Sequence, residues 1–135
     1  MECWENEYYF SSDKSLLSID RIHHLLSQSY WANTRKKDTI EMSVSNSICC
    51  GIYHNSLQVG FARVVTDFAT IYWLCDVIVD EGHRGKGLGK KLIGVITNSE
   101  ELKGLRGILR TKDAHGLYEQ NGYVRDGEYF MARGC

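Results

Sequence analysis

A six-residue glycine-rich stretch, RGKGLG at residues 84–89, constrains the fold of this chain more than any other feature. The β-branched run just before it, at residues 77–79, is typical of a buried strand. After it, apolar residues return at helical spacing, at Leu88, Leu92, Val95 and Ile96. The sequence therefore predicts a strand, a glycine turn and a helix in direct succession.

This order of elements predicts an anion site at the turn. The start of a helix leaves several backbone N–H groups without internal partners, and the helix dipole places positive charge there. Glycines lack the Cβ atoms that would keep an anion away from those N–H groups. Arg84, Lys86, Lys90 and Lys91 add cationic side chains. A phosphate, above all a pyrophosphate, suits such a site.

The two best-known phosphate fingerprints do not fit this turn. A dinucleotide fingerprint needs glycines spaced G-x-G-x-x-G, and here they stand at 85, 87 and 89. A P-loop needs Lys-Ser/Thr directly after its last glycine, which this stretch lacks. The stretch instead resembles the Arg/Gln-x-x-Gly-x-Gly/Ala motif of the GCN5-related N-acetyltransferases, the GNAT family, whose loop holds the pyrophosphate of acetyl-coenzyme A (acetyl-CoA).

A second segment supports the resemblance. Leu117-Tyr118-Glu119, followed by Gly122 and Tyr123, is similar to the family's closing Leu-Tyr-Glu-x-x-Gly-Phe element, with tyrosine in place of phenylalanine. The resemblance implies an N-acetyltransferase in which a neutral amine attacks the thioester of acetyl-CoA directly. The residues that it implies for cofactor binding are Val77, Ile78, Val79, Arg84, Gly85, Lys86, Gly87, Leu88, Gly89, Lys90, Thr111 and Tyr118.

Two residues are candidates for catalysis. By resemblance, Tyr118 faces the sulfur of the cofactor and protonates the leaving thiolate, while a backbone N–H at Val77 or a neighbour polarises the thioester carbonyl. Asp76 is a carboxylate within an apolar strand, which is costly unless it is paired or lies in a cleft. It is therefore a candidate general base or amine anchor, or alternatively a partner of Arg63 or a cap for a neighbouring backbone group.

The acceptor is predicted only as a class. Trp31, Arg35, Arg63 and Asp76 are candidates to line its site, where arginines suit a carboxylate and Asp76 suits an amine. We therefore expect a small-molecule amine, an amino acid or a peptide as substrate. The alternative is a protein that binds coenzyme A or an acyl-CoA without catalysing transfer, as a sensor or subunit.

The fold is predicted as one mixed α+β domain over residues 1–135, with a mostly antiparallel sheet flanked by helices in the order β-α-α-β-β-β-α-β-α-β-β. A first strand is expected at 7–10, then a helix capped by Ser12 or Asp13 and a second one at 38–45. Three strands at 48–53, 57–66 and 70–79 precede the glycine turn. A strand at 107–111, a helix at 114–120 capped by Asp113, and strands at 123–124 and 128–132 complete the order.

Charge and composition restrict the partners. A net charge of −1 argues against bulk binding of nucleic acid or a membrane surface. Five cysteines without a C-x-x-C pair favour a reduced, cytoplasmic protein over a disulfide framework. No metal is expected, because His23 and His24 have no partner cluster in the sequence. The sequence leaves open whether the protein forms a homodimer.

Overall fold

The structure is a computed structural model that describes residues 1–134, and its centre is a curved six-stranded sheet. The strands lie in sequence order across the sheet, and every neighbouring pair is antiparallel except the last, which is parallel. They are β1 (Glu2–Glu5), β2 (Tyr8–Ser11), β3 (Ile48–His54), β4 (Leu57–Thr66), β5 (Ile71–Val79) and β6 (Arg106–Ile108).

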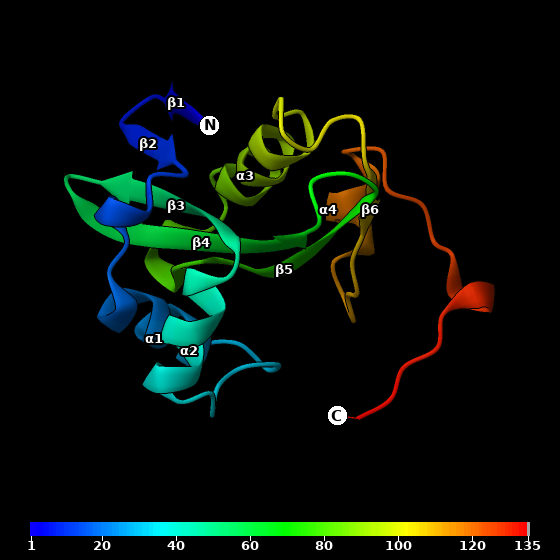
Figure 1. The fold of residues 1–135 in the computed structure, drawn as a ribbon. Helices are drawn as coiled ribbons and strands as arrows, with labels where there is room; N and C mark the ends of the chain where they lie inside the picture. The colour runs from blue at the N-terminus through cyan, green and yellow to red at the C-terminus, as the bar shows by residue number, and fades with distance from the viewer. Residues whose placement is uncertain (135) are drawn as a thin grey trace.

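Helices cover both faces of the sheet (Figure 1). α1 (Ile19–Ser27) and α2 (Lys37–Ser45) pack on one face, and α3 (Leu88–Thr97) packs on the other, with α4 (His115–Glu119) beside it. The core accordingly has two parts. Ile22, Leu25 and Ile40 bury their side chains under the first face, and Leu88, Leu92, Ile93 and Ile96 fill the second. Within the described part of the chain, three short 3₁₀ helices complete the fold, at Lys14–Leu16, Glu81–His83 and Gly127–Tyr129.

A β-bulge in β5 changes which residues face which layer. The register with β4 shifts between the pairs Phe61–Ile78 and Arg63–Cys75, so that the residues between them are two on β5 and one on β4. Asp76 lies in this bulge with φ 55°, a conformation that costs a non-glycine residue about 1 kcal/mol. Before the bulge, even-numbered residues such as Leu74 face α3, whereas Ile78 beyond it packs under α1.

The parallel pair of strands separates soon after it forms. β5 and β6 pair over three positions, from Ile71–Arg106 to Trp73–Ile108. From Leu74 to Val79, β5 has no strand beside it on that side within residues 1–134. The carboxyl end of β5 is therefore an open strand edge, and it leads directly into the glycine turn.

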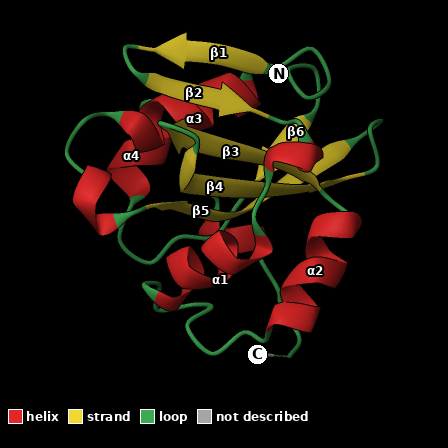
Figure 2. Ribbon diagram, turned by 90° about the vertical axis from the view of Figure 1, so that its left-hand side faces the viewer, coloured by secondary structure: helices red, strands yellow, loops and turns green. Residues whose placement is uncertain are grey.

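The predicted α+β class is confirmed, but the order of elements is wrong at both ends. The N-terminal part forms two strands, β1 and β2, where one was expected. Residues 123–124 and 128–132 form no strand; beyond Tyr123, which packs against the core, the chain continues as a tail that contains the 3₁₀ helix at Gly127–Tyr129 and runs toward the side of α1 and α2 (Figures 1 and 2). With only three residues, β6 offers a short edge for pairing, and Phe130 instead packs near Trp73, with 6.0 Å between the ring centroids.

Two predicted helix caps are also wrong. α1 is capped by Ser18, whose Oγ accepts from the Arg21 N–H, while Asp13 caps the 3₁₀ helix at Lys14–Leu16. At α4, the N-cap residue is Ala114 and not Asp113, and the Ala114 N–H donates to Thr111 Oγ1 at 3.0 Å. Among residues 1–134, no helix is both long and apolar enough to cross a membrane.

Candidate functional site

The glycine turn forms a row of unpaired backbone donors. Gly85 and Gly87 adopt positive φ values of 80° and 77°, which L side chains rarely adopt. Gly87 is also the N-cap residue of α3 and supplies no side-chain cap. Within residues 1–134, the N–H groups of residues 85–90 have no hydrogen-bond acceptor, and the first N–H that is bonded belongs to Lys91.

This turn fits a pyrophosphate. A Cβ atom built on Gly85 or Gly87 meets nothing within 4 Å, so the turn faces open space. The N-terminus of α3 adds its dipole to the row of N–H groups. Orphan donors, a positive dipole and the absence of Cβ atoms at Gly85 and Gly87 are together what a phosphate anion needs, so these residues fit the pyrophosphate group of coenzyme A.

Two of the predicted cations around the turn, Arg84 and Lys86, are held by neighbouring residues. Arg84 Nε donates to the Val79 carbonyl at 2.9 Å, which ties the turn to the end of β5. Lys86 Nζ donates to the Tyr8 hydroxyl at 3.2 Å, and that hydroxyl lies 2.8 Å from His83 Nδ1. Sequence reasoning missed Tyr8 and His83, because only the fold brings β2 next to the turn.

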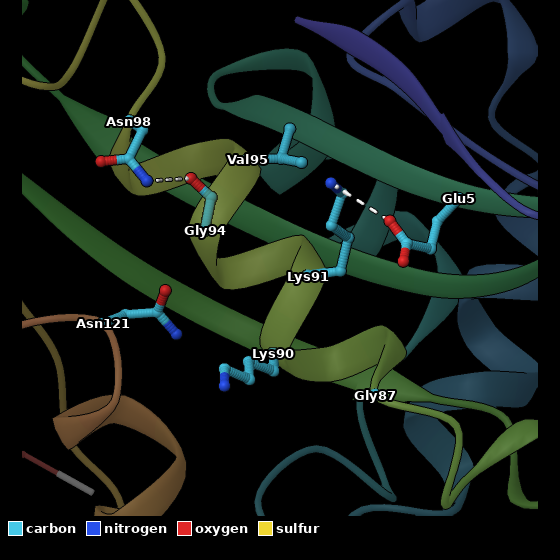
Figure 3. Close-up of a pocket in the computed structure, with 8 residues that line it drawn as sticks. All are labelled: Glu5, Gly87, Lys90, Lys91, Gly94, Val95, Asn98 and Asn121. Atoms are coloured by element: carbon cyan, nitrogen blue, oxygen red, sulfur yellow. Dashed lines mark hydrogen bonds and ion pairs between the residues drawn. The ribbon is translucent and has the colours of Figure 1, made fainter.

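A hollow of about 440 Å³ extends from the turn along the outer side of α3 (Figure 3). Its lining includes Gly87, Lys90 and Asn121, and Lys91 at its rim forms a salt bridge with Glu5 at 3.2 Å. The buried side-chain amide nitrogen of Asn121, Nδ2, has no hydrogen-bond partner within the described residues. The hollow offers polar groups next to the glycine turn, but Asp76 and Tyr118 do not line it.

The four predicted acceptor-site residues meet at the bulge in β5. Asp76 Oδ2 accepts from Arg35 NH1 at 2.7 Å and from Arg63 Nε at 2.9 Å, while Oδ1 accepts from Trp31 Nε1 at 3.1 Å. Arg63 NH1 also donates to Ser47 Oγ at 3.3 Å. Asp76 is buried, so its pairing with Arg63, one of the predicted alternatives, explains how a carboxylate is tolerated in this strand.

Tyr118 lies on α4, next to the open part of β5. Its side chain packs against the core under α3, and its ring is 6.0 Å from that of Tyr123. Burial, with smaller contributions from the nearby Tyr30 and Cys75, raises the pKa of Tyr118 to about 12. No hydrogen bond engages its hydroxyl within residues 1–134, so the hydroxyl is a free donor at neutral pH.

Several residues predicted to bind the cofactor have side chains that are engaged within the fold. The side chains of Ile78 and Leu88 are buried in the two cores, and those of Val77 and Val79 pack against the core under α3. Thr111 Oγ1 accepts from the N–H of Ala114, the residue just before α4. Residues 1–134 hold no group of three or more His, Cys, Asp or Glu side chains arranged for a metal ion.

Comparison with known proteins places this geometry in a family. A family model described as "Acetyltransferase (GNAT) domain" matches residues 45–125. A Gibberella zeae protein named "Putative acetyltransferase" is 28% identical over 144 residues, which covers 89% of this chain and 80% of that protein.

Solved structures agree. A Xanthomonas campestris protein described as a "putative acetyltransferase belonging to the gnat family" is 37% identical, with a TM-score of 0.91 over 98% of this chain and 96% of that one. A structure from Deinococcus radiodurans shares the fold at 19% identity, with a TM-score of 0.78 over 98% of this chain and 94% of that one. The chain is therefore an acyltransferase that belongs to the GNAT acetyltransferase family.

Proposed function

We propose that this enzyme transfers the acetyl group of acetyl-CoA to the primary amine of a small molecule or peptide by direct attack of the amine. The observation that carries the proposal is the row of unpaired N–H groups at residues 85–90, directly beyond the open edge of β5. Acetyl-CoA, when bound, supplies an activated acetyl group as a thioester. The turn supplies donors for its pyrophosphate, and the open strand edge supplies donors and acceptors for its amide groups.

Backbone and side-chain donors are available at both ends of the bond that breaks. The N–H of Val77 or a neighbour, on the unpaired part of β5, donates to the carbonyl oxygen as negative charge develops there. The hydroxyl of Tyr118 donates to the departing sulfur. Because its pKa of about 12 exceeds that of a thiol, near 8.5, the hydroxyl keeps its proton and donates a hydrogen bond to the leaving thiolate, which takes its proton from solvent.

Asp76 is the proposed acceptor of the proton that the amine releases. Its Oδ2 already accepts from two guanidinium groups, whereas Oδ1 accepts only the Trp31 indole N–H. A carboxylate oxygen has two lone-pair positions, so Oδ1 has room for one more hydrogen, taken directly or through water.

An acceptor screen tests this proposal. The protein is incubated with acetyl-CoA and a panel of primary amines, and N-acetylated products are identified by mass spectrometry together with thiol release. Acetyl-CoA binding is measured separately by calorimetry, in competition with ATP and NAD. Bound acetyl-CoA without any acetylated amine would instead favour the non-catalytic CoA-binding alternative.

A further inference from the structure

Two arginines, Arg35 and Arg63, pair with a single carboxylate, Asp76, at the bulge in β5. This excess of positive charge bears on which chemical groups the acceptor carries. We propose that the acceptor amine carries an oxyanion, a carboxylate or a phosphate, which binds to Arg35 and Arg63 beside Asp76. This inference rests on the proposed acetyl transfer and names the substrate class for the same site.

Charge balance is the first argument. One buried carboxylate, Asp76, faces two guanidinium groups, so the cluster carries a net charge of about +1. One arginine is enough to neutralise Asp76. The second is a partly desolvated cation without an anionic partner in the cluster, and such a charge is costly unless a ligand supplies the counter-charge.

Unused donors are the second argument. Each guanidinium group has five N–H bonds in a planar fork. Within residues 1–134, Arg35 uses one of them, on Asp76, and Arg63 uses two, on Asp76 and Ser47. The remaining N–H bonds can be reached, because the side chains of Arg35 and Arg63 are 24% and 15% exposed. Guanidinium forks bind carboxylates and phosphates in bidentate geometry.

Position is the third argument. Asp76 immediately precedes Val77, on the strand edge that we assign to the thioester, so an anion at these arginines places the rest of the acceptor near the reacting bond. The segment that supplies Arg35 also supplies two aromatic side chains, Tyr30 and Trp31, which are 54% and 42% exposed and in edge contact at 5.1 Å. Exposed aromatic faces beside cations provide an amphipathic wall for a small organic anion.

Matched acceptor pairs test the proposal on the wild-type protein. We compare phenylalanine with phenethylamine for the carboxylate, and phosphoethanolamine with ethanolamine for the phosphate, at saturating acetyl-CoA. In at least one pair, we expect the anionic member to have a kcat/KM at least tenfold higher, and the pair that shows it identifies the oxyanion. Equal or higher kcat/KM for the member without the oxyanion in both pairs would overturn the proposal while leaving acetyl transfer intact.

A binding measurement separates the proposal from turnover. Inorganic phosphate and phenylacetate are titrated against the protein while tryptophan fluorescence is recorded, and Trp31→Phe assigns the signal. We expect saturable binding of at least one probe, weakened at least tenfold by Arg35→Gln and partly restored by Arg35→Lys. Arg106→Gln is the matched control, because Arg106 lies in an exposed ion pair with Asp126. Absence of saturable binding, or equal weakening by both glutamine variants, would overturn the proposal even if no amine in the screen were acetylated.

Discussion

Arg35 NH1 lies 2.7 Å from Asp76 Oδ2 although 41 residues separate them along the chain. This contact ties the segment between α1 and α2 to the bulge in β5, in the part of the strand beyond its last pair with β6. The ion pair therefore joins the predicted acceptor side of the site to the strand edge that we assign to the thioester.

Asp76→Asn should lower both stability and turnover. The change keeps the shape of the side chain but leaves two arginines without their anion. Their partial exposure moderates the cost, so we expect the free energy of unfolding to fall by about 2 kcal/mol. The corresponding fall in Tm is on the order of 5–8 °C in thermal denaturation.

With Asp76 as the proton acceptor, kcat should also fall in Asp76→Asn, while acetyl-CoA affinity is unchanged by calorimetry. Asp126→Asn, in the exposed pair with Arg106, should change Tm little; equal effects of the two variants would contradict a special role for Asp76.

Gly87→Val should weaken acetyl-CoA binding at least tenfold. A branched side chain would occupy the open space in front of the unpaired N–H groups, and the positive φ of 77° adds strain of about 1–2 kcal/mol. Calorimetry measures the affinity, and circular dichroism checks that the fold is retained. Gly82→Ala is the matched control in the same loop, because its Cβ also meets no atom but its φ is not positive. Unchanged affinity in Gly87→Val would exclude the turn as the pyrophosphate site.

Tyr118→Phe should lower kcat about 100-fold, with acetyl-CoA affinity nearly unchanged, because it keeps the ring and deletes the donor.

The pH profile gives a second test. Burial raises the pKa of Tyr118 to about 12, so the protonated, active form persists up to that pH and is lost only above it. The wild-type kcat/KM should therefore rise as the amine deprotonates and show no decline between pH 7 and 10.5. A decline near pH 10 that disappears in Tyr118→Phe would show an unperturbed tyrosine. Single-turnover measurements are needed where product release limits kcat.

Tyr123→Phe should destabilise the fold by about 1–2 kcal/mol. The Tyr123 hydroxyl lies 2.7 Å from the Tyr72 hydroxyl and 2.8 Å from Thr97 Oγ1, and so joins β5 to α3. Its loss leaves the buried Tyr72 hydroxyl without that partner. Adding Tyr72→Phe should recover part of the stability in urea denaturation, because the unpaired polar group is then removed as well. Tyr129→Phe, at an exposed position, should have no effect. A double variant with fully additive losses would contradict this explanation.

Local patterns in the sequence determined the glycine turn and the elements around it. Positive φ at Gly85 and Gly87 needs glycine, and the helical spacing after the turn is visible in the chain itself, so strand, turn and helix could be predicted together. The same local information failed at the C-terminus. Residues 123–124 and 128–132 have a strand-like composition, but a strand also needs an edge to pair with, and the length of β6 is a property of the fold.

Only the tertiary structure decided which distant segments of the chain come into contact. The sequence offered Trp31, Arg35, Arg63 and Asp76 as candidates to line one acceptor site, but it could not orient them and left open whether Asp76 was free or paired. The bulge in β5 turns Asp76 toward the segment after α1 and brings the four side chains into one hydrogen-bonded cluster. Likewise, Tyr8 reaches Lys86 only because β2 packs next to the turn. Side-chain direction depends on strand register and on packing between layers, and no local pattern in this chain encodes either one.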